Sequence, residues 1–348
     1  MVAVQMADMT IWDGLFVDIQ LRFTNPDDLI IRRRRRGKGW QYIDADGVTI
    51  VDPLEVLRLN KVGLPPAYQD GLFCGHRFGH VQAVGTDARG RRQYRYHPEF
   101  RSARDVSKFS RCLEFGKNLP KIRAQIARDI AGRPNAPETV IAAVVRLLDI
   151  AHLRIGNEAY AKSNKSFGAT TLRGRHAKLT GYTLSLRYRG KSGIVRSITL
   201  HDPKLARVVK RCRELPGQHL FQYEDNEGLA KVVSSTDVNE YLRRIAGGNF
   251  TAKDFRTWGG TLSAFEAYID LSSDGETPTI VQISSVVAKA LGNTPNIARK
   301  SYIHPAVVGA IEIGSLGTLS KPKPSEWQSV AERQLLNFLR SANGAHTK

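Results

Sequence analysis

The sequence is poor in cysteine, in long apolar runs and in acidic residues, and each shortage excludes a class of protein. Its three cysteines lie far apart without a CxxC pair, which predicts neither a disulfide framework nor a structural zinc site and favours a reducing compartment. The longest apolar runs, such as Val140–Val145, are far too short to cross a bilayer. The acidic N-terminus has neither the charged nor the apolar region of a signal peptide. We therefore expect a cytoplasmic protein.

Motifs for nucleotides and metal ions are also missing. Gly190-Lys191-Ser192 resembles the end of a phosphate-binding loop, but Ser185 stands where that loop requires its first glycine. His76 and His80 lack the intervening Glu of a zinc-binding HExxH helix, and no compact group of Asp and Glu suits two metal ions. The sequence thus predicts no cofactor, no metal ion and no nucleotide.

Basic charge, by contrast, is abundant. The chain of 348 residues has 52 Lys and Arg against 33 Asp and Glu, which gives a formal net charge of +19. An excess of this size favours a polyanionic partner over a surface that is basic only for solubility. No basic amphipathic helix stands out, so a membrane surface is the weaker alternative.

Two segments predict where a polyanion binds. No acidic residue lies between Glu158 and Asp202, a segment that includes the exposed-looking hairpin around Lys191. Arg89–His97 interleaves Arg with Gln and Tyr, as in an exposed strand. Gln reads base edges, Tyr stacks on bases or bonds phosphate, and Arg does either, so we expect DNA contacts here. The alternative is a strand whose tyrosines pack inwards. The expected DNA-binding residues are Arg89, Arg91, Arg92, Gln93, Tyr94, Tyr96, Arg173 and Arg175.

The composition and the apolar patterning of the chain predict three parts and an α+β fold. Residues 1–30 hold five Asp and one Arg and are expected to form an acidic N-terminal arm. Residues 31–103 contain the run Arg32–Arg36, short strand-like stretches and a hairpin signal at Asp46-Gly47, which predict a β-rich DNA-binding domain. Helical spacing dominates residues 104–348, which predicts a mainly α-helical domain.

Several elements of the last part are predicted individually. Apolar spacing predicts a helix over Glu138–Arg154. Two alternating stretches around Arg189–Gly193 predict a β-hairpin with Lys191 at its tip. Gly292 suits the end of one helix and Pro295 the start of the next. Further helices are expected at Asp237–Ala246, Leu262–Asp270, Ile280–Leu291 and Glu326–Ala342.

Five residues in these settings favour chemistry on a phosphodiester. A tyrosine hydroxyl has a pKa near 10 and is a poor nucleophile unless neighbouring cations favour its ionised form. Arginines bind phosphate oxygens bidentately and stay protonated as charge develops. Without metal or nucleotide help, any phosphoryl transfer must rely on such protein cations. The candidate catalytic residues are Arg154, Lys191, Arg256, Asn293 and Tyr302.

Several stretches, in the right order, resemble a type IB DNA topoisomerase of the small bacterial and poxviral branch. The resemblance extends over nearly the whole sequence after the acidic arm, and its motifs together are specific. They are Leu64-Pro65-Pro66-Ala67, Asp87–Arg91 with Gln93–His97, Leu153–Asn157, Gly190–Gly193, Lys253–Trp258 and Ser301–Pro305.

The resemblance implies a role for each candidate residue. Tyr302 would attack a DNA phosphate and form a 3′-phosphotyrosyl bond. Arg154 and Arg256 would bind the non-bridging oxygens, and Lys191 would protonate the departing 5′-oxygen. Asn293 departs from the family, which usually has His nine residues before the nucleophile. Because Asn donates a hydrogen bond without charge, we expect a weaker contact that does not titrate near neutral pH.

The implied activity is relaxation of supercoiled double-stranded DNA by transient cleavage of one strand and religation, without ATP or metal. The resemblance also implies a monomer that clamps DNA between two domains and works on the nucleoid. A tyrosine recombinase is an alternative, but recombinases commonly have His at the position of Lys253 and a helical N-terminal domain. A non-catalytic architectural DNA-binding protein would explain the charge and leave the five residues without a role.

Overall fold

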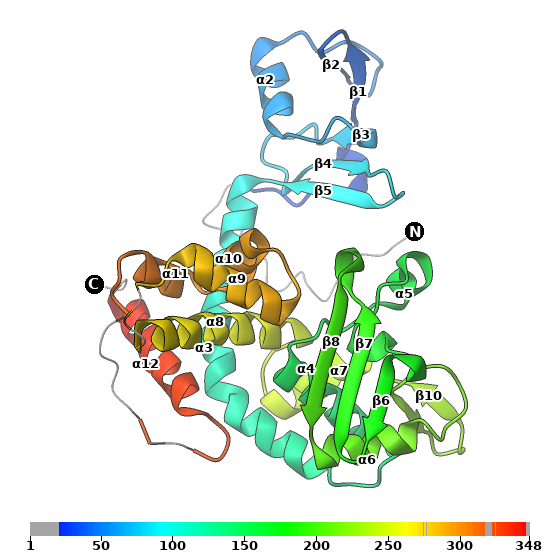
Figure 1. The fold of residues 1–348 in the computed structure, drawn as a ribbon. Helices are drawn as coiled ribbons and strands as arrows, with labels where there is room; N and C mark the ends of the chain where they lie inside the picture. Colours follow the sequence, from blue (N-terminus) through cyan, green and yellow to red (C-terminus); the bar gives the residue numbers. More distant parts are fainter. Residues whose placement is uncertain (1–20, 274, 276, 317–321, 324, 346–348) are drawn as a thin grey trace. The chain divides into compact units, whose positions relative to one another are not determined.

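A computed structural model of the chain describes residues 21–273, 275, 277–316, 322–323 and 325–345. The chain divides into two compact units, one up to Lys108 and one from Phe109. The division falls within the long helix α3 (Pro98–Asp129), so the first turns of this helix belong to the first unit (Figure 1).

The first unit is built on a five-stranded antiparallel sheet with the order β2-β1-β3-β4-β5. Its strands are β1 (Ile31–Arg36), β2 (Gly39–Ile43), β3 (Gln69–Phe73), β4 (Val81–Thr86) and β5 (Arg92–Tyr96). The arginine run forms most of β1. Arg33 donates to the carbonyl oxygens of Leu64 (2.6 Å) and Pro65 (2.5 Å), and its guanidinium lies 4.1 Å from the centre of the Trp40 ring. This member of the run is therefore a structural residue.

Helix α2 (Pro53–Lys61) packs its apolar side on the sheet. Asp52 caps the helix by accepting from the backbone N–H of Leu54 (3.0 Å), and Pro53 occupies the first position, where its missing N–H costs nothing. The small core between helix and sheet consists of Ile31, Tyr42, Leu59, Leu64, Phe73 and Ala83.

Residues 21–30 also belong to this unit. The backbone N–H of Arg22 donates to Phe78 O (2.8 Å), and Arg22 O accepts from His80 N–H (2.9 Å). Leu21 and Thr24 are buried, and a 3₁₀ turn, η2, covers Pro26–Asp28. This part of the predicted acidic arm therefore packs on the unit. The remainder of the arm, residues 1–20, lies outside the described residues.

The second unit is mainly helical. Its helices after α3 are α4 (Pro137–Ala151), α5 (Glu158–Asn164), α6 (Pro203–Cys212), α7 (Ser235–Ala246), α8 (Ala252–Ser273), α9 (Ile280–Leu291), α10 (Pro295–Tyr302), α11 (Pro305–Glu312) and α12 (Val330–Ala345). An antiparallel sheet comprises β6 (Ala177–Thr180), β7 (Thr183–Arg189) and β8 (Val195–His201), and β9 (Gln222–Glu224) pairs with β10 (Ala230–Val232). The predicted α+β fold, with a β-rich part followed by a mainly helical part, is confirmed.

Helix α8 is the centre of the second unit and packs against α4, α7, α9, α10, α11 and α12 (Figure 1). Its Trp258 is fully buried and donates through Nε1 to Glu332 of α12 (3.3 Å). Arg123 of α3 holds the same carboxylate (2.9 Å) together with Asp149 of α4 (2.8 Å). These shared ion pairs join three helices around α8.

One predicted helix ends earlier than its apolar spacing suggests. Instead of running over Glu138–Arg154, α4 ends at Ala151. His152 takes the left-handed conformation (φ 49°) and its N–H closes the last turn on Leu148 O (3.0 Å). The spacing is misleading because Ile155, which continues it, packs against the core from a loop rather than from a helix. Arg154 therefore lies outside the helix.

Three other predicted helices differ in how closely their bounds agree with the structure. Ile280–Leu291 is found with the expected bounds, while the helix expected over Leu262–Asp270 extends over Ala252–Ser273 and so includes Arg256. The helix predicted over Glu326–Ala342 begins only at Val330.

Candidate active site

Tyr302 is the last residue of α10, two turns after the helix begins. Thr294 caps this helix by accepting from the N–H of Ile297 (3.4 Å), and Pro295 occupies its first turn, as the sequence predicts. The end of the helix is held from α8, where the hydroxyl of Thr261 donates to Tyr302 O (3.1 Å). The tyrosine ring is thus fixed at a junction between α10 and α8.

Arg256 lies beside this ring, on the second turn of α8. It is 3% exposed, and its guanidinium carbon is 4.8 Å from the centre of the Tyr302 ring. Its two terminal nitrogens donate to the carbonyl oxygens of His152 and Leu291, the latter at 3.1 Å. Two helix ends therefore fix the direction of the guanidinium.

Arg154 reaches the same place from the loop after α4. The loop is anchored by the N–H of Ala169, which donates to Arg154 O (2.8 Å). The guanidinium donates to Gly292 O (3.4 Å) and to the side-chain oxygen Oδ1 of Asn293. The structure therefore joins Arg154 and Asn293, which lie far apart in the sequence.

Asn293 follows Gly292, the left-handed residue (φ 62°) that ends α9. Because Oδ1 accepts from Arg154, the amide nitrogen Nδ2 is the free donor of this side chain. Among the described residues, Asn293 Nδ2 and Arg256 Nε belong to a small set of buried polar atoms that lack a hydrogen-bond partner. Buried donors without an acceptor are rare in folded proteins, and here two of them occur in one cluster.

Lys191 stands at the tip of the β7–β8 hairpin, as predicted. Strands β7 and β8 pair from Thr183 with His201 to Arg189 with Val195, and Lys191–Gly193 form a single 3₁₀ turn between them. The lysine side chain is exposed and makes no ion pair or side-chain hydrogen bond with any residue that the structure describes. Its ammonium is therefore available to a ligand.

The charges of this cluster act on the tyrosine. Burial alone would raise the pKa of Tyr302, but the charge of Arg256, its hydrogen bond with the phenol, and the charges of Arg154 and Lys191 outweigh burial and lower that pKa below its usual value. Burial and the neighbouring charge of Arg256 lower the pKa of Arg154 to about 10, so Arg154 still carries its proton at neutral pH. The arrangement favours an ionised phenol among permanent cations.

Three residues that support the site, Gly259, Gly260 and His152, were not predicted from the sequence. A Cβ on Gly259 would lie 2.4 Å from the ring of His152, and one on Gly260 would lie 2.9 Å from Cβ of Tyr302. These glycines of α8 therefore allow a loop and a helix to approach closely on either side. The paired glycine within a helix was the available signal, because glycine disfavours helix interiors unless packing requires it. Nothing in the sequence marks His152.

The predicted DNA-binding residues of the first unit divide into two groups. Asp87 binds Arg91 (2.7 Å) and accepts from the Gln93 amide (3.0 Å), and its hydrogen bond with Arg91 holds the pKa of the carboxyl well below its usual range. These two side chains are therefore tied to the turn before β5. Tyr94 is 47% exposed, and its ring stacks with that of Tyr96, the centroids being 6.2 Å apart. The exposed members of the set are Arg89, Arg92 and Tyr94.

In the second unit, Arg173 is not the unopposed cation that the sequence suggests. It binds Glu158 (2.8 Å) and donates to the ring of His219, while its own side chain is only 15% exposed. Glu158 lies at the border of the segment without acidic residues, and the fold places its carboxylate against Arg173. Arg175 is exposed and has no ion pair among the described residues.

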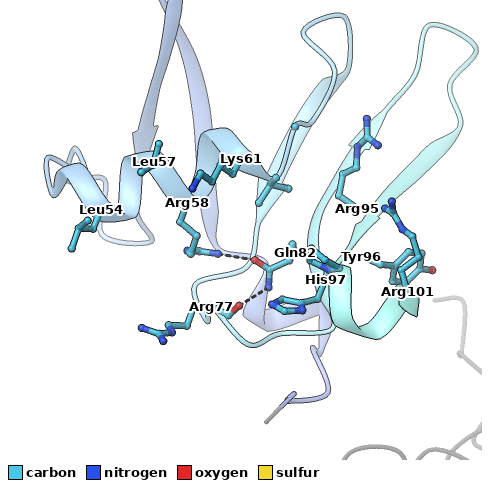
Figure 2. Close-up of a pocket in the computed structure, with 13 residues that line it drawn as sticks. Leu54, Leu57, Arg58, Lys61, Arg77, Gln82, Arg95, Tyr96, His97 and Arg101 are labelled. Carbon is cyan, nitrogen blue, oxygen red and sulfur yellow. Dashed lines mark hydrogen bonds between the residues drawn. The ribbon is translucent and has the colours of Figure 1, made fainter. Parts of the chain in front are cut away.

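A basic pocket of about 540 Å³ opens in the first unit, between α2, the end of β5 and the start of α3. Figure 2 shows Arg58 donating to Gln82 (2.9 Å), with Lys61 and Arg95 among the other lining side chains. Arg58 is neutralised by Glu55 (2.5 Å). The remaining cations around the pocket are Lys61, Arg77, Arg95 and Arg101.

No group of three or more His, Cys, Asp or Glu within the described residues could hold a metal ion. Among the same residues, no helix combines the length and apolar character needed to traverse a bilayer.

Comparisons with known proteins connect this geometry to one family. The family model described as the catalytic core of eukaryotic DNA topoisomerase I matches residues 97–311. The model of the N-terminal domain of bacterial DNA topoisomerase IB matches residues 39–87. Among solved structures, a XerH site-specific recombinase bound to its difH substrate superposes on 53% of this chain and 47% of that chain, with 18% identity and a TM-score of only 0.35.

Curated relatives give the same result. DNA topoisomerase 1B of Acanthamoeba polyphaga mimivirus is 30% identical over 285 residues, which are 78% of this chain and 84% of that protein. DNA topoisomerase 1B of vaccinia virus (strain Copenhagen) is 23% identical over 256 residues, or 71% of this chain and 78% of that protein. The chain therefore belongs to the type IB DNA topoisomerases and relaxes supercoiled DNA through a tyrosine-linked intermediate.

Proposed function

We propose that Tyr302 is the nucleophile of this topoisomerase and forms the link to a 3′-phosphate of one DNA strand. The observation that carries the proposal is the position of its ring, 4.8 Å from the guanidinium of Arg256, within a cluster whose charges lower the pKa of the phenol. A lowered pKa raises the ionised fraction, which is the form that attacks phosphorus.

Arg154 and Arg256 would bind the two non-bridging oxygens of the attacked phosphate. Both guanidiniums are held by backbone carbonyls, so they need no reorganisation when charge builds up on these oxygens. Asn293 would add a neutral donor through Nδ2, because its Oδ1 is engaged by Arg154. An anionic oxygen would give Asn293 Nδ2 and Arg256 Nε the acceptor that they lack.

Lys191 would act as the general acid. When Tyr302 attacks, the bond from phosphorus to the 5′-oxygen breaks, and this oxygen needs a proton to leave as a hydroxyl. An ammonium at an exposed hairpin tip suits this task, and loss of such an acid typically lowers rates by about 10²–10⁴-fold.

The phosphotyrosyl bond retains the energy of the broken phosphodiester, so the 5′-hydroxyl can attack back and reseal the strand without ATP or metal. We further propose that the protein acts as a monomer on the nucleoid in the cytoplasm, with both units gripping double-stranded DNA. The exposed Arg89, Arg92, Tyr94 and Arg175, together with the cations of the basic pocket, would supply sequence-independent contacts to phosphates.

One assay tests these assignments. Supercoiled plasmid is incubated with the protein in EDTA without ATP, and the reaction is stopped with detergent. We expect stepwise relaxation and protein attached to 3′ ends, and Tyr302→Phe should abolish both while DNA binding persists. Attachment to 5′ ends, or full relaxation by Tyr302→Phe, would refute the proposal. Exchange between paired sites would indicate a recombinase, and binding without relaxation an architectural protein.

A further inference from the structure

Arg196 connects the hairpin that carries Lys191 to the helix that precedes the tyrosine helix. On β8 it lies directly opposite the buried Tyr188 of β7. Its guanidinium crosses to the end of α9 and donates to Lys289 O (3.0 Å) and Ala290 O (2.7 Å). The last carbonyls of a helix lack partners within the helix and favour a cation, so this contact is stabilising.

Arg196 is one of three arginines that bind successive carbonyls at the end of α9. Arg256 and Arg154, the candidate phosphate ligands, bind the next two carbonyls along the chain. The four acceptors in order are the carbonyl oxygens of Lys289, Ala290, Leu291 and Gly292. The same backbone turn thus fixes both candidate phosphate ligands and the base of the lysine hairpin.

The contact with Arg196 is also tight. A Cβ on Gly292 would lie 2.8 Å from Cδ of Arg196, so the side chain lies directly against the backbone that leads into Asn293. Beyond this contact the tip of the hairpin is exposed from Lys191 to Val195. Because its guanidinium is already engaged with two carbonyls, Arg196 is placed to hold the hairpin rather than to bind substrate.

We propose that Arg196 is a positioning residue that fixes the Lys191 hairpin relative to the nucleophile. Cleavage requires a new bond from Tyr302 to phosphorus and a proton from Lys191 on the departing 5′-oxygen, at opposite sides of the same phosphate. Misplacing a catalytic group by about 1 Å can cost about 10²-fold in rate. The proposal rests on the roles proposed above for Lys191 and Tyr302.

The test is single-turnover cleavage of two duplexes that differ only in the leaving atom, a 5′-oxygen or a 5′-sulfur. A thiol has a pKa of about 8.5, so sulfur leaves without a proton donor. Lys191→Ala should lose about 10²–10⁴-fold on oxygen and recover on sulfur. Arg196→Ala should lose about 10–10²-fold on oxygen and recover on sulfur as well, because only proton delivery is impaired.

Two variants complete the design. Arg207→Ala removes a similar contact outside the site, since Arg207 donates to Ile130 O (2.7 Å) and Gly132 O (3.0 Å), and it should cleave both duplexes at the normal rate. Arg196→Lys retains the charge but not the planar pair of donors, and should show a smaller form of the same oxygen-specific loss even if the alanine variant folds poorly.

Normal cleavage of the oxygen duplex by both Arg196 variants would overturn the proposal, and so would an equal loss on both duplexes. If Lys191→Ala recovers on sulfur and the Arg196 variants do not, only the role of Arg196 is refuted. If Lys191→Ala itself fails to recover, the general-acid role falls and the proposal falls with it.

Discussion

At the scale of single residues, the site is organised by hydrogen bonds from arginine side chains to backbone carbonyls. Arg256 joins His152 to Leu291, and Arg154 joins the loop after α4 to Gly292. Donors that are fixed before substrate arrives stabilise developing charge more effectively than donors that must first reorient. The side chain of Asn293 extends this arrangement, since its oxygen is engaged by Arg154 and its nitrogen is left to donate.

Asn293→Asp tests which atom of this side chain matters. The aspartate retains an oxygen for Arg154 but loses the donor and adds a negative charge near the phosphate. We expect single-turnover cleavage to slow by about 10²–10³-fold, the range for removal of one oxyanion-hole donor. Asn293→Ala is the matched variant and should be slowed by a similar or smaller factor. Wild-type cleavage by both variants would show that Asn293 has no catalytic role.

The lowered pKa of Tyr302 predicts a pH dependence. A tyrosine whose pKa is lowered ionises at a lower pH, so the cleavage rate should rise with pH and level off below the usual value of about 10. Arg154→Gln removes one of the charges that lower the pKa and should move the midpoint upwards, besides reducing the rate. The measurement is single-turnover cleavage across pH, in which midpoints rather than amplitudes are compared. Identical midpoints in both proteins would contradict the electrostatic explanation.

At the scale of helices and strands, α8 brings the site together because small residues let its neighbours come close. Gly259 and Gly260 admit the ring of His152 and the backbone of Tyr302. On another side of the helix, Trp258 lies against Gly116 of α3, where an added Cβ would be only 2.2 Å from the indole ring. The packing of α3 on α8 therefore depends on glycine at position 116, where any larger residue would overlap the indole.

Gly116→Ala should destabilise the protein, because the new methyl overlaps a fully buried ring that cannot move aside. Overpacking of a core typically costs about 1–3 kcal/mol. Gly309→Ala on α11 is the matched control: a Cβ there meets nothing within 4 Å, so alanine should stabilise that helix by about 0.5–1 kcal/mol. Both free energies of unfolding are measured by urea titration. Equal stability of the two variants would contradict this interpretation of the contact.

At the scale of the whole molecule, the net charge of +19 determines how the protein meets DNA. The structure shows that the basic residues are not equivalent, since some are paired within the fold and others are exposed. Arg173 is held by Glu158 and Arg91 by Asp87, whereas Arg175 and Arg92 are exposed. Only cations free to release counterions from phosphates contribute to the salt dependence of binding.

Arg175→Gln and Arg173→Gln should therefore affect different properties: the first the salt dependence of DNA binding, the second the stability of the fold. Arg175→Gln should reduce the slope of log affinity against log salt by about 0.9, the value for one phosphate contact, without changing the melting temperature. Arg173→Gln should leave the slope nearly unchanged and lower the melting temperature, because Glu158 and His219 lose their partner. Both slopes come from titrations of a short duplex at several salt concentrations. A reversed pattern would show that Arg173 binds DNA.

The sequence predicted the bounds of helices correctly where a residue with a strong backbone preference, such as glycine or proline, stands at the boundary. The junction between α9 and α10 is an example, because Gly292, Thr294 and Pro295 each favour one backbone conformation there. The end of α4 was missed because the apolar spacing continues past His152, whose left-handed conformation no local preference requires. Apolar periodicity indicates which side chains are buried, but this pattern does not distinguish a residue that is buried from a loop from one that is buried by a helix.

The sequence by itself determined the family, the charge, the hairpin around Lys191 and the start of the helix that carries Tyr302, since these depend on residue type and on neighbours along the chain. Only the tertiary structure decided which cations are free and which donors converge. The pairing of Arg173 with Glu158, the bond from Arg154 to Asn293 and the contact of Arg196 with the end of α9 all join distant segments. Such contacts depend on how helices pack, and packing is a property of the whole unit rather than of any stretch of sequence.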